Sequence, residues 1–205
     1  MCFFDFHTHT PKPDALVSCS PDAFFPLPNL TYSVGIHPWT QTDSYKLQEE
    51  LLWQHACHPQ VLAIGEAGLD RLVGGSMEGQ IDVFCRQARM AEELQKPMVL
   101  HAVRTTGELI ALRKRLRPAV KWVIHGFRGN QHVAESCVDA GFYLSYGTRY
   151  QLEALMATPL CRLLLETDEA VCPVEQVYRQ VAADLGIAIE RLEKQVAENV
   201  QSIIF

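Results

Sequence analysis

The feature that most constrains the fold is a regular alternation of short apolar segments with longer amphipathic ones. Eight apolar segments have the length of buried strands, and in most of the intervening segments apolar residues recur at helical spacing. This alternation is typical of a parallel sheet or barrel, because a helix returns the chain to the edge where the next parallel strand begins. The expected strands are residues 2–7, 14–19, 31–36, 61–65, 97–101, 121–125, 142–146 and 162–166.

The segments between these strands are expected to form helices. Pro97 and Pro118 stand beyond two of them, and Gly141 occupies the C-cap position of another. The length of 205 residues fits one domain, and no repeat or linker divides it. We therefore predict an α/β fold of the TIM-type (β/α) barrel class, in a single domain over residues 1–205. The expected helices are residues 43–57, 78–95, 105–117, 130–140, 150–157, 174–185 and 189–202.

Residues 10–30 interrupt the alternation. Prolines at positions 11, 13, 21, 26 and 28 leave no room for a crossover helix between the first two strands, although a parallel connection normally contains one. Either the barrel is incomplete or distorted there, or the second strand is only a loop. We expect this stretch to be the least regular part of the barrel.

Composition and charge exclude several classes of protein. The hydrophobic fraction of 48% and charged fraction of 20% are ordinary for a soluble domain, and no apolar run is long enough to span a membrane. The N-terminus has no leader pattern and the seven cysteines are scattered, so we expect reduced thiols in a cytoplasmic protein. We take a monomer as the default. A net charge of −6 argues against a broad basic surface, although bound divalent cations can supply the positive charge that a nuclease needs.

Metal-capable side chains follow the apolar part of most strands. His7 and His9 end the first strand, and because a strand alternates its faces, both point the same way. Two such histidines can be neighbours by chance. Similar residues follow later strands, however, and a parallel barrel brings the carboxyl ends of its strands together, so we predict one shared site. The later residues are His37, Glu66, His101, His125 and Asp168.

The residue types indicate which metals this site would hold. Neutral imidazoles mixed with carboxylates suit zinc, manganese or iron better than calcium or magnesium alone. Four imidazoles and two carboxylates from this set make six protein ligands, which are too many for one catalytic zinc but suit two ions with a carboxylate between them. The expected cofactor is therefore one or two divalent ions, with zinc, manganese and magnesium as the candidates.

Short motifs in chain order carry a resemblance to a known family. They are Asp5-Phe6-His7-Thr8-His9, Gly35-Ile36-His37-Pro38, Ile64-Gly65-Glu66-Ala67-Gly68-Leu69-Asp70, His101, His125-Gly126-Phe127-Arg128-Gly129, Glu166-Thr167-Asp168 and the ending Glu198-Asn199-Val200 through Phe205. Over essentially its whole length the chain resembles the TatD family of metal-dependent hydrolases and deoxyribonucleases, within the amidohydrolase-like superfamily. The resemblance implies that His7, His9 and Asp168 hold one metal, that His101 and His125 hold the other, that Glu66 bridges them, and that His37 faces the substrate.

The chain also departs from the family pattern. Val103 occupies the place of the family's arginine after the fifth strand, and Arg104 comes one residue later. The proline expected soon after Asp168 is displaced to Pro173. Family members are generally longer, and the missing length falls after the first strand and after Asp168, where loops would face the substrate.

The implied activity is hydrolysis by a metal-activated water, with Asp168 and Glu66 as the catalytic carboxylates. Arg128 and Arg104 follow ligand-bearing strands and can clamp a phosphate, or are ordinary surface arginines. We therefore expect a phosphodiesterase or deoxyribonuclease acting on DNA ends or small phosphodiesters. Four aromatic residues offer either a stacking surface for a base or simple packing at the barrel rim: Trp39, Phe127, Tyr146 and Tyr150.

Two alternatives remain open from the sequence. One is an amidohydrolase-type enzyme that cleaves a C–N or ester bond of a small molecule. The other is a relative that binds metal without catalysis, because shortened loops have lost the substrate.

Overall fold

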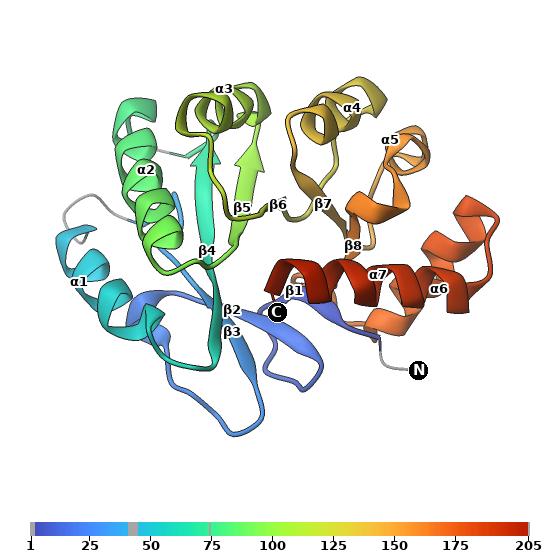
Figure 1. Ribbon diagram of the computed structural model, residues 1–205, viewed down its shortest axis with the longest axis horizontal. Coiled ribbons are helices and arrows are strands. Elements are labelled where there is room, and N and C mark those ends of the chain that lie inside the picture. The colour runs from blue at the N-terminus through green and yellow to red at the C-terminus, as the bar shows by residue number, and fades with distance from the viewer. Residues whose placement is uncertain (1–2, 41–44, 74, 205) are drawn as a thin grey trace.

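The computed structural model describes residues 3–40, 45–73 and 75–204. Its centre is one sheet of eight parallel strands, arranged in the order of the sequence and curled into a nearly closed barrel (Figure 1). This arrangement confirms the predicted TIM-type α/β fold. The strands are β1 (Asp5–Thr8), β2 (Ala15–Cys19), β3 (Thr31–Val34), β4 (Val61–Asp70), β5 (Met98–Val103), β6 (Trp122–Ile124), β7 (Tyr143–Tyr146) and β8 (Leu163–Leu165).

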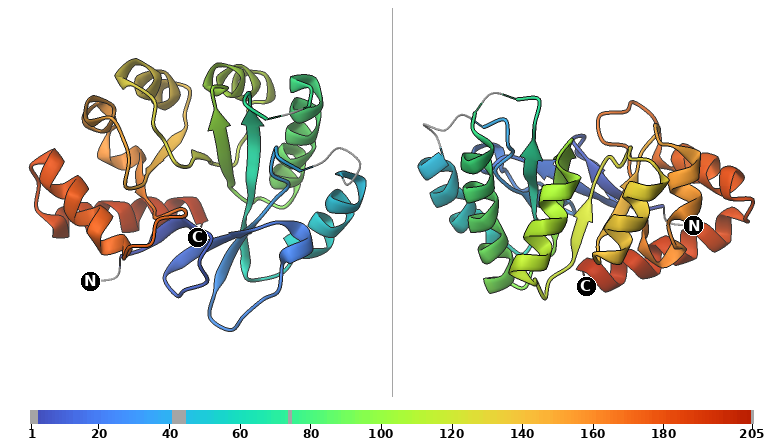
Figure 2. Two further views of the ribbon diagram at one scale, coloured as in Figure 1. Left: turned by 180° about the vertical axis from the view of Figure 1, so that it is seen from behind. Right: turned by 90° about the horizontal axis from the view of Figure 1, so that it is seen from above.

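All seven expected helices are present, and they pack on the outside of the sheet (Figure 2). Gly141 follows one of them with a φ of 92°, as its predicted C-cap role requires. Residue 2 of the first expected strand, residues 43 and 44 of the first expected helix and Phe205 lie outside the described residues. The helices are α1 (Tyr45–Ala56), α2 (Met77–Glu93), α3 (Thr106–Leu116), α4 (Gln131–Asp139), α5 (Leu152–Ala157), α6 (Val174–Leu185) and α7 (Ile189–Ile204), with short 3-10 turns η1 (Pro21–Ala23) and η3 (Leu160–Arg162).

The core lies between the sheet and these helices. Trp122 on β6 is fully buried, and its ring centroid is 5.2 Å from that of Phe84 on α2 and 6.0 Å from that of Phe142. Such aromatic contacts fix the helices against the strands. Within the described residues, no helix is both long and apolar enough to cross a membrane.

Strand β4 is longer than the sequence predicted. We expected it to end at residue 65, but it continues to Asp70 because its second half pairs with β5, with Gly68 opposite His101. A side chain at Gly68 would collide with the carbonyl oxygen of His101, so only glycine permits this close approach. As a result, Glu66 lies inside the sheet rather than in a loop beyond it.

The region of residues 10–30 is irregular, as predicted, because its only helical turn is η1. Strand β2 nevertheless forms, and it pairs in parallel with β1 and β3. The alternative in which a loop replaces the second strand is therefore wrong. A helix is unnecessary because β1 has only four residues, so the chain must return only about 13 Å to start β2.

Closure between β8 and β1 depends on a few contacts. The two strands share one isolated bridge, Thr8 with Asp168, and the Asp168 N–H donates to the carbonyl oxygen of His7 at 2.9 Å. The buried carboxylate of Asp5 completes the closure. It accepts hydrogen bonds from the Thr167 N–H at 2.9 Å and hydroxyl at 2.6 Å, and it lies 2.6 Å from the Lys12 ammonium. The first and last strands are thus joined mainly by side chains.

Candidate metal centre

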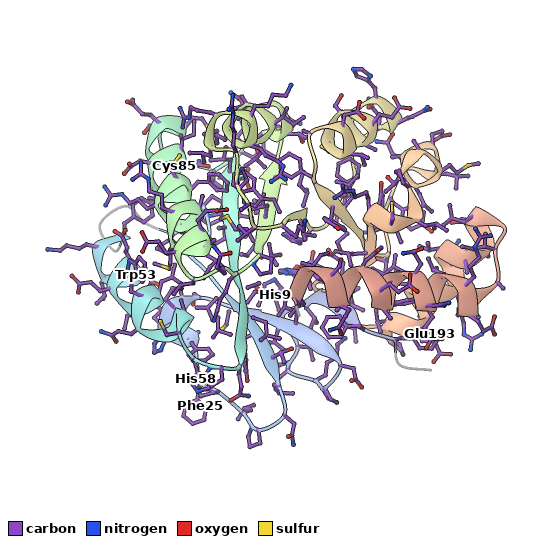
Figure 3. All side chains as sticks on the ribbon, in the orientation of Figure 1. His9, Phe25, Trp53, His58, Cys85 and Glu193 are labelled. Atoms are coloured by element: carbon purple, nitrogen blue, oxygen red, sulfur yellow. The ribbon has the colours of Figure 1, made fainter. Side chains whose placement is uncertain are left out.

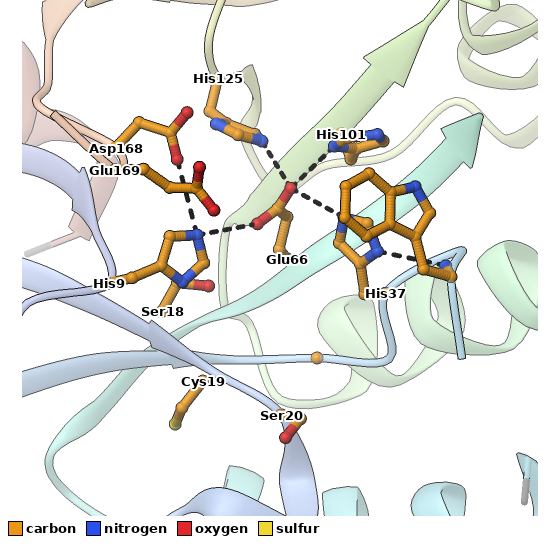
Figure 4. Close-up of a pocket in the computed structure, with 12 residues that line it drawn as sticks. His9, Ser18, Cys19, Ser20, His37, Glu66, His101, His125, Asp168 and Glu169 are labelled. Carbon is orange, nitrogen blue, oxygen red and sulfur yellow. Dashed lines mark hydrogen bonds and ion pairs between the residues drawn. The ribbon is translucent and has the colours of Figure 1, made fainter. Parts of the chain in front are cut away.

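Glu66 is the centre of a cluster of histidines at the carboxyl end of the barrel (Figure 4). Its Oε1 lies 2.7 Å from Nε2 of His125, 2.8 Å from Nδ1 of His101 and 3.1 Å from Nε2 of His37. These three histidines come from β5 and from the segments after β3 and β6. One oxygen of the carboxylate therefore faces the imidazoles of this side.

The other oxygen of Glu66 faces His7 on β1 and His9, which follows directly after this strand. Its Oε2 lies 3.4 Å from Nε2 of His7 and 3.7 Å from Nε2 of His9. Oδ1 of Asp168 is on the same side, 3.7 Å from His7 and 3.5 Å from His9. The two oxygens of Glu66 thus face different nitrogen donors, as a bridging carboxylate requires. The two sets of donors adjoin each other, because the ring centroids of His7 and His125 are 4.0 Å apart.

The side chains in this cluster fit a metal ion. His7 is fully buried, yet neither of its ring nitrogens has a hydrogen-bond partner among the described residues. A buried imidazole without a partner is costly, and a cation among these donors would satisfy it. Three groups each bring their ligand atoms within 4.8 Å of one another: His7, His9 and Glu66; His7, His125 and Asp168; and His37, Glu66 and His101.

Electrostatics in the cluster favour a cation. Burial raises the pKa of the Glu66 carboxyl, but the surrounding imidazoles, that of His125 above all, outweigh burial and hold this pKa well below its usual range. Burial also lowers the pKa of His125, but the Glu66 and Glu166 carboxylates outweigh it and raise this pKa well above its usual value. His125 must lose its proton before its lone pair can bind a metal, so metal affinity should fall as the pH falls.

Asp168 differs from Glu66 in its access to solvent. Its side chain is 27% exposed, whereas that of Glu66 is 8% exposed. Burial raises the pKa of the Asp168 carboxyl, but the imidazoles of His9, His7 and His125 together outweigh burial and bring this pKa below its usual range. Asp168 is therefore an ionised acceptor that faces a cavity of about 330 Å³.

Two further carboxylates support the histidines, and neither was predicted from the sequence to have a role. Oδ2 of Asp70 lies 3.1 Å from Nε2 of His101, on the opposite side of the ring from Glu66. Oε1 of Glu166 lies 3.4 Å from Nδ1 of His125 and accepts from the Gly126 N–H at 2.7 Å. A carboxylate behind a histidine fixes its tautomer and ring orientation. The signal was present in the sequence, because both residues belong to quoted motifs.

The structure brings together all six residues that the sequence assigned to metal binding, and it adds His37 to the same cluster. The prediction that His37 faces the substrate remains a prediction, because His37 also contacts Glu66 and can complete a ligand group with His101. Arg104 and Arg128 lie beside the centre, where both line a cavity of about 510 Å³ that also contains His101.

Comparison with known proteins identifies the family. A family model described as TatD related DNase matches residues 26–204. The chain belongs to the TatD family. It is therefore a metal-dependent hydrolase, and its clusters of His, Glu and Asp side chains can bind metal.

Relatives of this TatD protein support the assignment at two levels. The uncharacterized metal-dependent hydrolase YabD of Bacillus subtilis is 33% identical over 198 residues, which cover 83% of this chain and 76% of YabD. The deoxyribonuclease Tat-D of Schizosaccharomyces pombe is 30% identical over 163 residues, covering 70% of this chain and 52% of that protein. The crystal structure of YjjV, a TatD homologue from Escherichia coli, has the same fold, with a TM-score of 0.81, 21% identity and coverage of 99% and 98% of the two chains.

Proposed function

We propose that this TatD protein is a phosphodiesterase that cleaves DNA at chain ends by using a metal-activated water. The observation that supports this best is the position of Glu66, whose two oxygens face two groups of histidines. A pair of cations held in this way suits phosphodiester hydrolysis, in which negative charge develops on both the attacking and the leaving oxygen. The deoxyribonuclease name of a relative supports the choice of substrate.

Each residue has a proposed role in this reaction. His7, His9 and Asp168 would hold one cation, His101 and His125 the other, and Glu66 both. Bound divalent ions supply an acidified water and stabilise charge on the phosphate oxygens. Asp168 orients that water and accepts its proton, because its carboxylate is ionised and open to the cavity. His37 would face either the substrate or the cations from the opposite side of Glu66.

Arginines near the centre support a phosphate-bearing substrate. Arg128 and Arg149 line a cavity of about 250 Å³ that Asp168 also lines. The side chains of Arg104, Arg128 and Arg149 are exposed and form no ion pair with any described carboxylate. Arginines with free guanidinium groups beside a hydrolytic centre can bind the phosphates of a nucleic acid chain.

We also propose a cytoplasmic location, which the free cysteines support.

A substrate screen tests this function. Metal-free protein is supplied with Mn²⁺, Mg²⁺ or Zn²⁺ and assayed on single-stranded DNA, RNA of the same sequence, bis(p-nitrophenyl) phosphate and p-nitrophenyl acetate. We expect metal-dependent release of nucleotides from DNA and slower cleavage of the small phosphodiester. Cleavage of the carboxylic ester alone would replace this proposal with the amidohydrolase-type reaction, and activity on none of the four would favour the non-catalytic relative.

A further inference from the structure

Four aromatic residues were candidates for stacking against a base, and the structure separates one of them from the rest. Phe127 is 4% exposed and Tyr146 is fully buried, so both belong to the core. Tyr150 is partly buried and donates its hydroxyl to Asp184 at 2.6 Å. Trp39 is 61% exposed and lines the same cavity as Glu66. Only Trp39, of these four, presents a free ring beside the metal centre.

The exposed ring of Trp39 is held in place by contacts with less exposed residues of the metal centre. Its indole N–H donates to Oδ2 of Asp70 at 2.7 Å, and Asp70 is 2% exposed. Its backbone N–H lies 3.1 Å from Nδ1 of His37. The ring is T-shaped to those of His37 and His101, with centroids 4.8 and 5.9 Å away. One edge of the indole is therefore fixed against the centre, while most of its surface remains open to solvent.

An exposed tryptophan that is fixed in this way is suited to bind a flat ligand. Leaving a large apolar ring in water is unfavourable, and covering it with another ring recovers that free energy. The hydrogen bond to Asp70 has already ordered the side chain, so little conformational entropy is lost when a ligand binds. Stacking on an aromatic side chain accepts every nucleobase, because each base has a π face.

We propose that Trp39 is the stacking platform for the base of the terminal nucleotide, next to the phosphodiester that is cleaved. This inference rests on the proposed nuclease function. The cavity of about 330 Å³ is at the small end of the range for ligand sites, roughly 300–1,000 Å³, which suits one nucleoside rather than a strand. It is also lined by Ser18 and Cys19 at the end of β2 and by Ser20 just after it. The continuing strand would lie toward Arg128 and Arg149, which line the neighbouring cavity.

A kinetic cycle tests the platform. Two oligonucleotides of the same sequence are compared, of which one ends in a normal nucleotide and the other in an abasic residue. The pair is prepared twice, once with the abasic residue at the 3′ end and once with it at the 5′ end. Wild type should lose about tenfold in kcat/KM on the abasic substrate at one of the two ends, the lower part of what stacking contributes. On the normal substrate, the kcat/KM of Trp39→Leu should be about tenfold below that of wild type. On the abasic substrate, the kcat/KM of Trp39→Leu should be only a little lower than on the normal one. Trp39→Phe, which keeps a ring, should lose less.

Trp53 provides a matched control. It is also partly exposed, at 39%, but it lies on α1 away from His9 (Figure 3). Trp53→Leu should behave as wild type on both substrates. The proposal is overturned if Trp39→Leu still discriminates between normal and abasic ends as wild type does, or if wild type cleaves both equally at each end.

A binding measurement separates failure of the platform from failure of the nuclease function. Deoxyadenosine monophosphate should quench tryptophan fluorescence of wild type and of Trp53→Leu, whereas deoxyribose 5-phosphate should not. The quenching should vanish in Trp39→Phe, because of the two remaining tryptophans Trp122 is fully buried and Trp53 does not line the cavity of the metal centre. Quenching without hydrolysis of any oligonucleotide would reject the nuclease function and keep the base-binding site. If oligonucleotides are hydrolysed but no quenching depends on Trp39, the stacking platform is rejected and the nuclease function is kept.

Discussion

The two sides of the barrel are built differently, yet both supply metal-capable side chains to one cluster. Every strand from β3 onward is followed by a helix, whereas β1 and β2 are followed by proline-rich loops with only the turn η1. His7 and His9 come from the loop side, and Glu66, His101 and His125 from the helical side. Crossover helices are therefore not needed to place a ligand strand, provided that other contacts hold it against its neighbours.

The difference matters for how firmly each ligand is held. On the helical side, carboxylates of Asp70 and Glu166 support His101 and His125 from behind. On the loop side, Nε2 of His7 faces Glu66 and Asp168, but its other ring nitrogen, Nδ1, has neither a hydrogen bond nor an ion pair with a described residue. We therefore expect the two proposed metal positions to be unequal, with the one at β1 losing its ion first during dialysis against a weak chelator.

The largest effect should come from the residue that joins the two sides. Glu66→Gln removes the negative charge that faces both groups of histidines, so both metal equivalents should be lost and kcat/KM should fall by about 10⁴-fold. Metal analysis and kinetics on the same samples check this. Glu153→Gln, an exposed change on α5, serves as the control. Retention of both metals in Glu66→Gln would contradict the bridging role.

Asp168→Asn should separate catalysis from binding. The amide keeps the shape of the carboxylate but cannot accept a proton, so turnover should fall by about 10²–10³-fold. Metal content should fall less than in Glu66→Gln, because His7 and His9 remain. Full turnover in Asp168→Asn would show that another group accepts the proton.

The supporting carboxylates test the inequality of the two sides directly. Asp70→Asn and Glu166→Gln should each weaken metal binding by about 10- to 100-fold at the position held by His101 and His125. The position held by His7 and His9 should keep its affinity. Titration of metal-free protein with Mn²⁺ or Zn²⁺ measures both affinities. Equal weakening at both positions would contradict the expected difference between the two sides.

The loop side should depend on Lys12 for stability. Lys12→Met keeps most of the side chain but removes the ammonium 2.6 Å from the buried Asp5 carboxylate. The remaining hydrogen bonds from Thr167 only partly compensate, so the free energy of unfolding should fall by about 2 kcal/mol. Urea denaturation checks this, with Lys121→Met as an exposed control. An unchanged midpoint would mean that the loop side is held without this pair.

The smallest effect is expected at Cys19, which lines the cavity at the end of β2. Burial raises the pKa of its thiol to about 12, so it stays protonated at neutral pH and is a poor ligand and nucleophile. Cys19→Ala should leave metal content unchanged, and iodoacetamide at pH 8 should label the exposed Cys57 and Cys161 first. Loss of metal in Cys19→Ala would show that the Cys19 thiolate is a metal ligand on the loop side.

The sequence predicted the order of the elements and the convergence of the metal-capable side chains because both depend on local patterns. Apolar runs of strand length mark β1 to β8, and the position of His101 or His125 at the end of such a run already places it on the barrel rim. The motifs of the family resemblance then selected Glu66 and Asp168 from the other acidic residues.

The extent of β4 and the supporting contacts were not predictable in the same way. Gly65 and Gly68 resemble strand terminators in the sequence, and only pairing with β5 shows that the strand continues to Asp70. Whether Asp70 contacts His101, or Glu166 contacts His125, depends on register and rotamer. The orientation of Trp39 depends in turn on Asp70. These are contacts between elements, and a residue pattern within one element carries no information about them.

The closing contact of the barrel also sets when the protein can become an enzyme during its synthesis. Thr8 and Asp168 meet at this contact, although they are 160 residues apart in the chain. At about 5–20 residues per second, the ribosome needs roughly 8–32 s to reach the second residue after making the first. During that interval the histidines of β1 exist without the carboxylate opposite them. The candidate metal centre is therefore completed in one late step, when β8 joins β1, and a nascent chain that ends before residue 168 lacks one of its two carboxylates.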